Sequence, residues 1–381
     1  MLKVMTIVGT RPEIIRLSRA IPKLDEQCEH ILVHTGQNYD YELNEVFFSE
    51  LGIRQPDHFL GAAGGSLGET LGRILSESER VISEEKPDAV LILGDTNSSI
   101  SAIMARRMKV PIYHMEAGNR SFDRNVPEES NRKIVDHISD FNLVYTEHAR
   151  RHLIAEGLPQ RRIYNTGSPM REVLEHFRSQ IDESEVLDTL GLTAGVYFIV
   201  SLHREENVDN STRLKGLLQA LTTLADHFDV PVVVSTHPRT RKRLEALGAD
   251  DNDTRIRFLK PFGFFDYNHL QKNALCAISD SGTISEEAAI LEFCAVTPRD
   301  AIERPEALDS GCIVMSGLTS ETMVPAVEAS IATFEARQPG DQSHVPTDYL
   351  VTNTSDRVVS LILGTARVSN QWDGIRANDL S

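Results

Sequence analysis

The chain has 381 residues, of which 40% are hydrophobic and 25% are charged, a composition typical of soluble globular proteins with two or three domains. Its 39 basic and 56 acidic side chains give a formal net charge of -17, which argues against nucleic acid or an anionic membrane as the main partner. The four cysteines form no CxxC pair, as expected in a reduced cytoplasm. The N-terminal apolar run is too short for a signal peptide, and no run reaches the roughly 20 residues of a membrane span. These features predict a soluble, cytoplasmic protein.

Short apolar runs alternate with helical patterns along the first half of the chain. Buried strands are predicted over residues 2–8, 30–34, 89–93 and 111–115, and helices over residues 13–24, 41–51, 67–85, 98–108 and 128–138. Apolar runs bounded by Gly, Pro or Asp are typical of parallel strands that are covered on both faces. Because strands and helices alternate, the sequence predicts right-handed crossovers and an open, doubly wound α/β sheet.

The alternation restarts after a charged, helical stretch at residues 172–190. Strands are predicted over residues 197–201, 231–235, 256–259 and 275–279, and helices over residues 213–228 and 239–247 and from residue 284 onward. The junction between two similar α/β domains is expected near residues 168–174, and the tail contains a helical stretch at residues 355–363. We therefore expect domains over residues 1–170 and 171–354, followed by a C-terminal segment at residues 355–381.

Titratable or small polar residues follow each strand that has a clear end. Ligands of doubly wound sheets bind beyond the carboxyl ends of the strands, so these residues are expected at one edge of each sheet. They occupy positions 9–13, 94–97 and 116–120 in the first domain, and 203–204, 237–239 and 280–283 in the second. Each also has a simpler explanation when taken singly. Asp95 can cap a helix, Glu116 can be a surface charge, and a lone histidine such as His203 is more often packed or exposed than catalytic.

The segment that begins at Pro127 allows two interpretations. Glu128 and Arg132 are four residues apart, so they share one helix face and can form a solvent-exposed ion pair. Alternatively, Glu128 is a third carboxylate directed at Asp95 and Glu116. Carboxylates gathered in one dry site push their pKa values apart and can supply an acid and a base.

Common cofactor motifs are absent from the sequence. It contains neither the GxGxxG fingerprint of dinucleotide cofactors nor the Walker pattern GxxxxGK[ST]. No HxH, HExxH or paired cysteines support a metal site. The turn Ser281-Gly282-Thr283 precedes a predicted helix, whose free N–H groups and dipole could bind a diphosphate. The sequence thus predicts no cofactor and no metal.

Several of these segments occur in the order that characterises a known family. The chain carries GTRPE at 9–13, GDT at 94–96, HMEAG at 114–118, PEESNR at 127–132, LHREEN at 202–207, DSG at 280–282 and RDAIERPE at 299–306. Over residues 2–320 it resembles the non-hydrolysing UDP-N-acetylglucosamine 2-epimerases. The resemblance implies two Rossmann-like doubly wound domains that face a cleft, as in glycosyltransferase-B folds, with the nucleotide sugar in that cleft. It also implies a homodimer and a C-terminal helix that crosses back to the first domain.

The chemistry that the resemblance implies is inversion at C2 of a UDP-2-acetamido sugar without a cofactor. Removal of the C2 proton and loss of UDP from C1 give a 2-acetamidoglycal, which is protonated on the opposite face before UDP re-adds. Asp95, Glu116 and Glu128 match the acid/base positions, and His203 matches a histidine on the diphosphate side. The implied substrate-binding residues are Arg11, Arg16, Arg132, Tyr267, Ser281, Gly282, Thr283, Glu287 and Arg304.

Three positions depart from the family pattern. Arg16 stands where the family usually has lysine, Thr283 replaces the second glycine of an SGG turn, and TGQNYD at 35–40 replaces a QHR-type run that helps to bind an allosteric activator. Residues 115–140 are most similar to the UDP-N-acetyl-L-fucosamine synthase branch, which epimerises UDP-2-acetamido-2,6-dideoxy-β-L-talose to give a precursor of capsule and O-antigen. The alternatives are a UDP-N-acetylglucosamine/N-acetylmannosamine epimerase, a glycosyltransferase of the same fold, and a UDP-sugar sensor without turnover.

Overall fold

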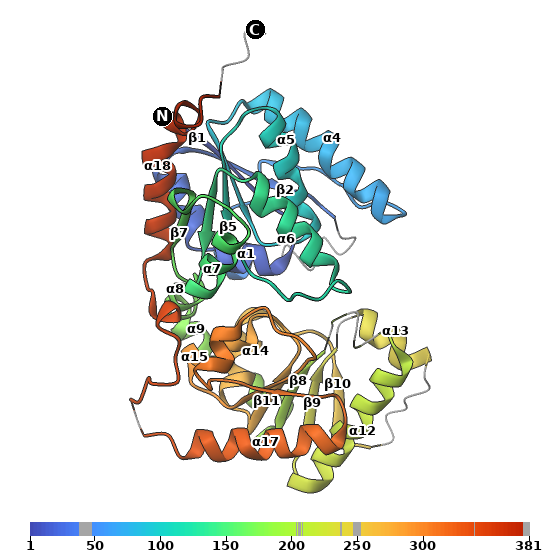
Figure 1. Ribbon diagram of the computed structural model, residues 1–381. Helices are drawn as coiled ribbons and strands as arrows, with labels where there is room; N and C mark the ends of the chain where they lie inside the picture. The colour runs from blue at the N-terminus through green and yellow to red at the C-terminus, as the bar shows by residue number, and fades with distance from the viewer. Residues whose placement is uncertain are drawn as a thin grey trace. The chain divides into compact units, whose positions relative to one another are not determined.

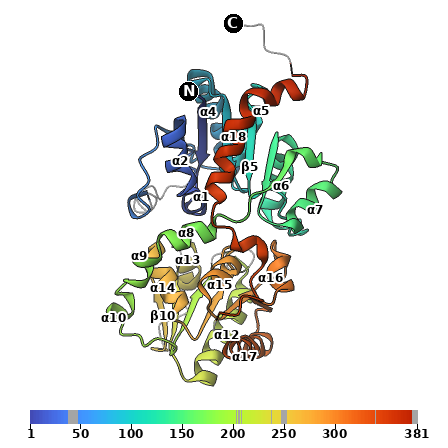
Figure 2. The same cartoon turned by 90° about the vertical axis from the view of Figure 1, so that its left-hand side faces the viewer.

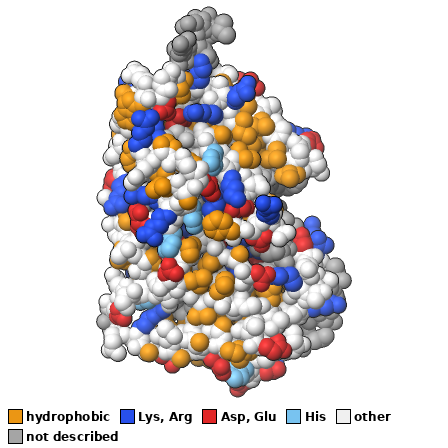
Figure 3. Space-filling view, in the orientation of Figure 1, with side chains coloured by type: hydrophobic (Ala, Val, Ile, Leu, Met, Phe, Trp, Pro, Cys, Tyr) orange, Lys and Arg blue, Asp and Glu red, His pale blue; other side chains and the backbone are white. Residues whose placement is uncertain are grey.

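The computed structural model describes residues 1–37, 48–202, 204, 207, 209–236, 238–246, 253–338 and 340–375. The chain forms two compact units (Figure 1): unit 1 comprises Met1–Val173 and Leu350–Ser381, and unit 2 comprises Leu174–Tyr349. Across the described ranges, no helix is both long and apolar enough to cross a membrane. On the face shown in Figure 3, Lys and Arg side chains are interspersed with Asp and Glu.

Unit 1 is built on a parallel sheet, which within the described ranges has seven strands in the order β3-β2-β1-β4-β5-β6-β7. The strands are β1 (Lys3–Val8), β2 (Glu29–His34), β3 (His58–Phe59), β4 (Ala89–Leu93), β5 (Ile112–Met115), β6 (Phe141–Val144) and β7 (Ile163–Asn165). Every residue of β4 is buried, as expected of a strand with helices over both faces. The strand order reverses between β1 and β4, and ligands of such sheets bind beyond the carboxyl ends at this reversal.

The helices of unit 1 cover both faces of this sheet. They are α1 (Arg11–Leu17), α2 (Ala20–Gln27), α4 (Leu67–Glu85), α5 (Ala102–Arg107), α6 (Pro127–Ile138), α7 (Glu147–Ala155) and α18 (Thr354–Trp372), with 3₁₀ turns η1 (Asn97–Ser101) and η2 (Gln160–Arg162). Figures 1 and 2 show α18 lying along unit 1. The Arg162 guanidinium lies 4.6 Å from the Phe141 ring and 5.3 Å from the Trp372 ring, and its Nη2 is 2.7 Å from Asp373 Oδ2. These contacts attach the last helix to the rest of the unit.

Unit 2 repeats the same architecture with a parallel sheet that has six strands in its described part, in the order β10-β9-β8-β11-β12-β13. The strands are β8 (Phe198–Ser201), β9 (Val232–Ser235), β10 (Ile256–Leu259), β11 (Cys276–Ser279), β12 (Ala295–Pro298) and β13 (Val314–Ser316). The surrounding helices are α9 (Arg178–Asp182), α10 (Val186–Leu190), α12 (Ser211–Phe228), α13 (Pro238–Ala246), α14 (Phe264–Lys272), α15 (Ile284–Leu291), α16 (Pro305–Asp309) and α17 (Ser320–Glu335), with the 3₁₀ turn η3 (Thr347–Leu350). Here the order reverses between β8 and β11. The prediction of two doubly wound α/β sheets is confirmed.

Three predicted helices are divided in the structure. Residues 13–24 form α1 and α2, because Pro22 lacks the N–H that a continuous helix would donate to Ser18. Residues 98–108 begin as η1, where the hydroxyls of Ser99 and Ser101 donate to carbonyls of the preceding turn and so compete with α-helical hydrogen bonding. Residues 172–190 form α8 (Met170–His176), α9 and α10 in succession. Most of the helix predicted over 41–51 lies outside the described residues, although 48–50 are helical.

Candidate active site

The turn between β1 and α1 is organised by Glu13, a buried carboxylate. Its Oε2 accepts hydrogen bonds from the backbone N–H groups of Gly9 and, at 3.1 Å, of Thr10, as in a capping box. Its Oε1 accepts from the hydroxyls of Thr96 and, at 2.7 Å, of Ser98. Burial raises the pKa of Glu13 to about 7, although these hydrogen bonds oppose the shift. Glu13 therefore joins the loops that follow β1 and β4, on either side of the strand-order reversal.

Asp95 follows β4 and is held by the start of α6. Arg132 Nε lies 2.6 Å from Asp95 Oδ2, and Asn131 Nδ2 donates to the Asp95 carbonyl at 2.9 Å. The same Arg132 donates through Nη1 to Glu129 Oε2 at 3.0 Å. Burial alone would raise the pKa of Glu129, but hydrogen bonds from Ser121 and the charge of Arg132 outweigh it and hold that pKa below its usual range. One guanidinium thus binds two carboxylates in a largely buried cluster.

Glu116 follows β5 in a left-handed conformation, with φ of 65°. Such a φ is strained in a residue with a side chain, and strained residues cluster at functional sites. Arg16 Nη1 forms an ion pair with Glu116 Oε2, and Asn119 Nδ2 donates to Oε1 at 3.2 Å. The Arg16 guanidinium carbon also lies 5.7 Å from the Tyr145 ring centre. A planar guanidinium can pair and stack at once, so arginine at position 16 is not equivalent to the lysine of the family pattern.

The structure brings Asp95 and Glu116 to one edge of the unit 1 sheet, each with a buried arginine. Gly94 lies close to Glu116, since a Cβ added at Gly94 would lie 3.7 Å from Glu116 Oε2. Glu128 lies on the exposed face at the start of α6. Arg11 is half-buried at the first position of α1.

Sequence reasoning missed two carboxylates of this region. Glu13 lies within the GTRPE run, yet nothing in that run shows that it reaches the β4 loop. Glu129 lies three residues before Arg132, a helical spacing that could have revealed the ion pair between them.

In unit 2, the turn after β11 is held by a buried aspartate. Asp280 Oδ2 accepts from the Arg204 backbone N–H at 3.1 Å and from Asn207 Nδ2 at 3.0 Å. Arg204 Nε donates to the Asp280 carbonyl at 2.9 Å, and its Nη1 lies 3.2 Å from Glu303 Oε1. Residues after β8 and after β11 are therefore tied together at the point where the strand order reverses.

The turn Ser281-Gly282-Thr283 leads into α15 and lies against a second arginine. Arg304 is buried, its Nε donates to the Gly282 carbonyl at 2.8 Å, and its Nη2 lies 3.2 Å from Glu286 Oε2. The hydroxyls of Ser281 and Thr283 lie 3.0 Å apart. Backbone N–H groups and hydroxyls at a helix N-terminus beside a guanidinium suit an anionic ligand such as a diphosphate.

Tyr267 and Glu287 lie near the same strand ends. Burial and the Glu287 charge raise the pKa of the Tyr267 hydroxyl above its usual range, against hydrogen bonds with Ser201 and Ser279. Glu287 is buried and accepts from Gln271 Nε2 at 2.9 Å. His203 lies outside the described residues, so its predicted role remains a prediction. Within the described ranges, no group of three His, Cys, Asp or Glu side chains is arranged to hold a metal ion.

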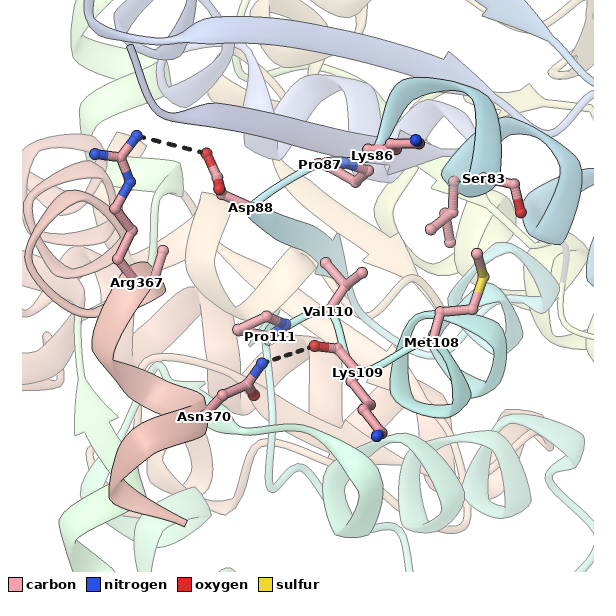
Figure 4. A pocket seen from close by; sticks show the side chains of 12 residues that line it. Ser83, Lys86, Pro87, Asp88, Met108, Lys109, Val110, Pro111, Arg367 and Asn370 are labelled. Atoms are coloured by element: carbon pink, nitrogen blue, oxygen red, sulfur yellow. Dashed lines mark hydrogen bonds and ion pairs between the residues drawn. The ribbon is translucent and has the colours of Figure 1, made fainter. Parts of the chain in front are cut away.

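A separate groove of about 750 Å³ opens at the amino ends of β4 and β5 (Figure 4). Its lining includes Asp88, which precedes β4, and Arg367, whose Nη2 lies 3.9 Å from Asp88 Oδ2. Asn370 on α18 donates to the Lys109 carbonyl at 2.8 Å across the same groove. It lies at the sheet edge opposite Asp95, and its lining includes none of the predicted site residues.

Comparisons with known proteins identify the family of this chain. Residues 22–363 match the family model described as UDP-N-acetylglucosamine 2-epimerase. The structure is similar to that of UDP-N-acetylglucosamine 2-epimerase from Rickettsia bellii, with a TM-score of 0.91 and 48% identity over 99% of this chain and 100% of that one. It is also similar to the Methanocaldococcus jannaschii UDP-GlcNAc 2-epimerase in complex with UDP-GlcNAc and UDP, with a TM-score of 0.87 and 34% identity over 95% of this chain and 100% of that one.

The name of one sequence relative specifies a different substrate. The UDP-2,3-diacetamido-2,3-dideoxy-D-glucuronate 2-epimerase of Pseudomonas aeruginosa is 36% identical over 336 residues, which cover 87% of this chain and 92% of that protein. Together with the family match, this extent of similarity establishes membership. The chain belongs to the UDP-N-acetylglucosamine 2-epimerase family, whose members are UDP-sugar 2-epimerases.

Proposed function

We propose that this member of the UDP-N-acetylglucosamine 2-epimerase family inverts C2 of UDP-2-acetamido-2,6-dideoxy-β-L-talose to give UDP-N-acetyl-L-fucosamine. The observation that carries the epimerase chemistry is the pair of carboxylates, Asp95 and Glu116, each bound to an arginine at one sheet edge. The choice of sugar is supported by the resemblance of residues 115–140 to the fucosamine synthase branch.

The proposed reaction is an elimination followed by an addition. One carboxylate removes the proton from C2 while the C1–O bond to UDP breaks, so that a C1–C2 double bond forms. A carboxylic acid then delivers a proton to the opposite face of C2, and UDP re-adds at C1. Asp95, Glu116 and Glu128 are the proposed acid/base groups. Arg132 holds Asp95, and Arg16 holds Glu116. Because neighbouring carboxylates titrate together, the acid and base roles belong to the set.

The residues of unit 2 are proposed to bind the UDP portion. Arg304 and the N–H groups at the start of α15, with Ser281, Gly282 and Thr283, would stabilise the negative charge of the departing diphosphate. Arg11 and His203 are proposed for the same charged part of the ligand. Tyr267 is proposed to lie beside the uracil and Glu287 to accept hydrogen bonds from the ribose. The family resemblance supports these roles, and the burial of Arg304 and Glu287 is consistent with fixed ligand contacts.

A second candidate substrate is UDP-N-acetylglucosamine. It is favoured by the name of the Rickettsia bellii protein, at 48% identity. Against it stands the altered segment after β2, where Gln37 Nε2 lies 3.4 Å from Thr96 Oγ1, beside Asp95. Residues 38–40 of that segment lie outside the described residues. The name of the Pseudomonas aeruginosa relative indicates that a protein 36% identical to this chain uses a different sugar.

The deciding experiment is a proton NMR time course in deuterium oxide with each of the two UDP sugars. We expect conversion of the L-talose compound alone, with deuterium appearing at C2. Conversion of UDP-N-acetylglucosamine alone would retain the chemistry and replace the sugar, whereas exchange with neither would overturn the epimerase proposal. Asp95→Asn, Glu116→Gln and Glu128→Gln are expected to lose exchange. Glu84→Gln, which removes an exposed charge on α4, serves as the control and is expected to retain it.

We also propose a cytoplasmic homodimer that serves capsule or O-antigen synthesis. The resemblance to the family supports the dimer, and the fucosamine product supports the pathway. Light scattering after size exclusion should give twice the chain mass of 42.5 kDa. A monomer under these conditions would contradict the first part of the proposal.

A further inference from the structure

We propose that His114 is a positioning residue for Asp95, an inference that rests on the proposed function. His114 lies on β5 and is fully buried. Its Nε2 lies 2.8 Å from the carbonyl oxygen of Gly94, the residue immediately before Asp95. A carbonyl oxygen can only accept, so Nε2 carries a proton and donates it in this hydrogen bond.

Gly94 is the point at which this hydrogen bond acts on the site. Gly94 has φ of 73°, a left-handed conformation that glycine adopts without strain. Its N–H donates to the Met115 carbonyl at 2.9 Å, so both backbone polar groups of Gly94 are bound to β5. Without the imidazole, the Gly94 carbonyl would lose this donor, and the peptide between Gly94 and Asp95 would be held less firmly. The direction of the Asp95 side chain depends on that peptide.

A chain of largely buried charged groups lies beside the imidazole. His114 Nδ1 lies 2.9 Å from Asp136 Oδ1, and Asp136 Oδ2 accepts from Arg120 Nη1 at 2.7 Å. Arg120 donates through Nε and Nη2 to the two oxygens of Glu156, at 2.7 Å each. These hydrogen bonds hold the pKa of Glu156 at about 2, so the Arg120–Glu156 pair is ionised at neutral pH. The carboxylate of Asp136 is thereby held in place beside the imidazole.

Thr96, the residue after Asp95, is also held by a buried group, Glu13. The Thr96 hydroxyl donates to Glu13, which is bound to the β1 turn. Asp95 therefore lies between two neighbours whose backbone or side chain is fixed by buried groups. A displacement of about 1 Å at a reacting group can cost about 100-fold in rate, so this anchoring matters to turnover rather than to ligand affinity.

Two variants separate the hydrogen bond to Gly94 from the rest of the network. The amide nitrogen of glutamine can occupy the place of Nε2, so His114→Gln retains the donor to Gly94. The amide of asparagine reaches only the place of Nδ1, so His114→Asn retains the Asp136 contact and loses the Gly94 contact. Tyr113→Phe is the matched control, since it removes a buried hydrogen bond of 2.6 Å to Thr365 from the adjacent position of the same strand.

We expect His114→Asn to lower kcat about 100-fold while KM changes by no more than a few-fold, and His114→Gln to restore most of kcat. Tyr113→Phe should leave both constants near those of the wild type. Equal kcat values for the Asn and Gln variants would overturn the inference, as would a loss confined to KM. If His114→Asn does not fold, Asp136→Asn replaces it, with an expected loss of about 10-fold in kcat.

A readout without substrate keeps the inference separate from the proposed function. Amide hydrogen exchange of residues 93–97 is expected to be faster in His114→Asn than in His114→Gln or Tyr113→Phe. If the wild type turned over neither UDP sugar, the proposed function would fail while this comparison still tested the positioning. Equal exchange rates in the three variants would overturn the positioning role itself.

Discussion

Glu13 gives a quantitative test of the site, because its carboxylate is buried between two loops. The ordinary pKa of this group is 4.5, and burial raises it to about 7 in the folded protein. Each pKa unit is worth about 1.4 kcal/mol, so the difference corresponds to about 3 kcal/mol. The perturbation is Glu13→Gln, which keeps the size of the side chain and removes its titration.

The sign follows from which state binds the proton. Below pH 4.5 the carboxyl is protonated in both states. As the pH rises from 4.5 to about 7, the unfolded chain loses the proton while the folded protein keeps it, so the wild type loses stability over this range. Above about pH 7 both states are ionised and the loss is complete. The free energy of unfolding of Glu13→Gln, measured relative to the wild type, should therefore rise by about 3 kcal/mol between pH 4.5 and pH 8.

The assay is urea unfolding at a series of pH values, followed by tryptophan fluorescence. Trp372 is the single tryptophan of the chain and lies in α18, so its signal reports on unit 1, which contains Glu13. Glu69→Gln is the matched control: Glu69 also accepts a hydrogen bond from a backbone N–H before its helix, from Gly65 at 2.8 Å, but its side chain is 45% exposed. Its replacement should leave the pH dependence unchanged. Parallel pH curves for Glu13→Gln and the wild type would refute the reasoning.

Two further predictions concern the attachment of the C-terminal segment to unit 1. Gly167 has φ of 78°, and a Cβ there would lie 2.5 Å from Val351 Cγ2. Gly167→Ala should therefore lower the free energy of unfolding by at least about 2 kcal/mol. Gly52→Ala is its control, since φ is 62° but nothing lies within 4 Å, and it should cost only about 1 kcal/mol in the same urea titration. Arg162→Ala removes the cation between the Phe141 and Trp372 rings and should lower the free energy of unfolding by about 2 kcal/mol. An unchanged Trp372 emission spectrum in the folded variant would contradict the contact between Arg162 and Trp372.

The strands at the centre of each sheet were predictable because each is a short run of mostly apolar side chains. The pattern at residues 89–93 coincides with β4, where every residue is buried. Strand β6 was missed because its four residues, FNLV, include a polar side chain. That side chain, Asn142, is buried and donates to the Asp136 carbonyl at 3.0 Å, a partner that no local pattern reveals. Short strands of this kind are decided by tertiary contacts rather than by periodicity.

For the site, the sequence indicated which residues meet but not how they pair. Asp95 and Glu116 were expected at one sheet edge because both follow parallel strands, and the structure places them there. Helical spacing suggested an ion pair between Glu128 and Arg132, but the contact of the Arg132 guanidinium with Asp95 could not be read from spacing. Pairings between residues far apart in sequence depend on the final packing of loops, which spacing rules do not describe.

The division of unit 1 into two stretches of chain has a consequence for its biosynthesis. Residues up to Val173 leave the ribosome first, but α18, which completes the same unit, follows only after all of unit 2 has been made. At about 5 to 20 residues per second, translation of the intervening stretch takes roughly 10 to 35 s. During that interval the surface around Phe141 and Arg162 lacks the helix that later covers it. The nascent chain therefore exposes apolar surface that a chaperone could bind, and unit 2 can complete its fold before unit 1 does.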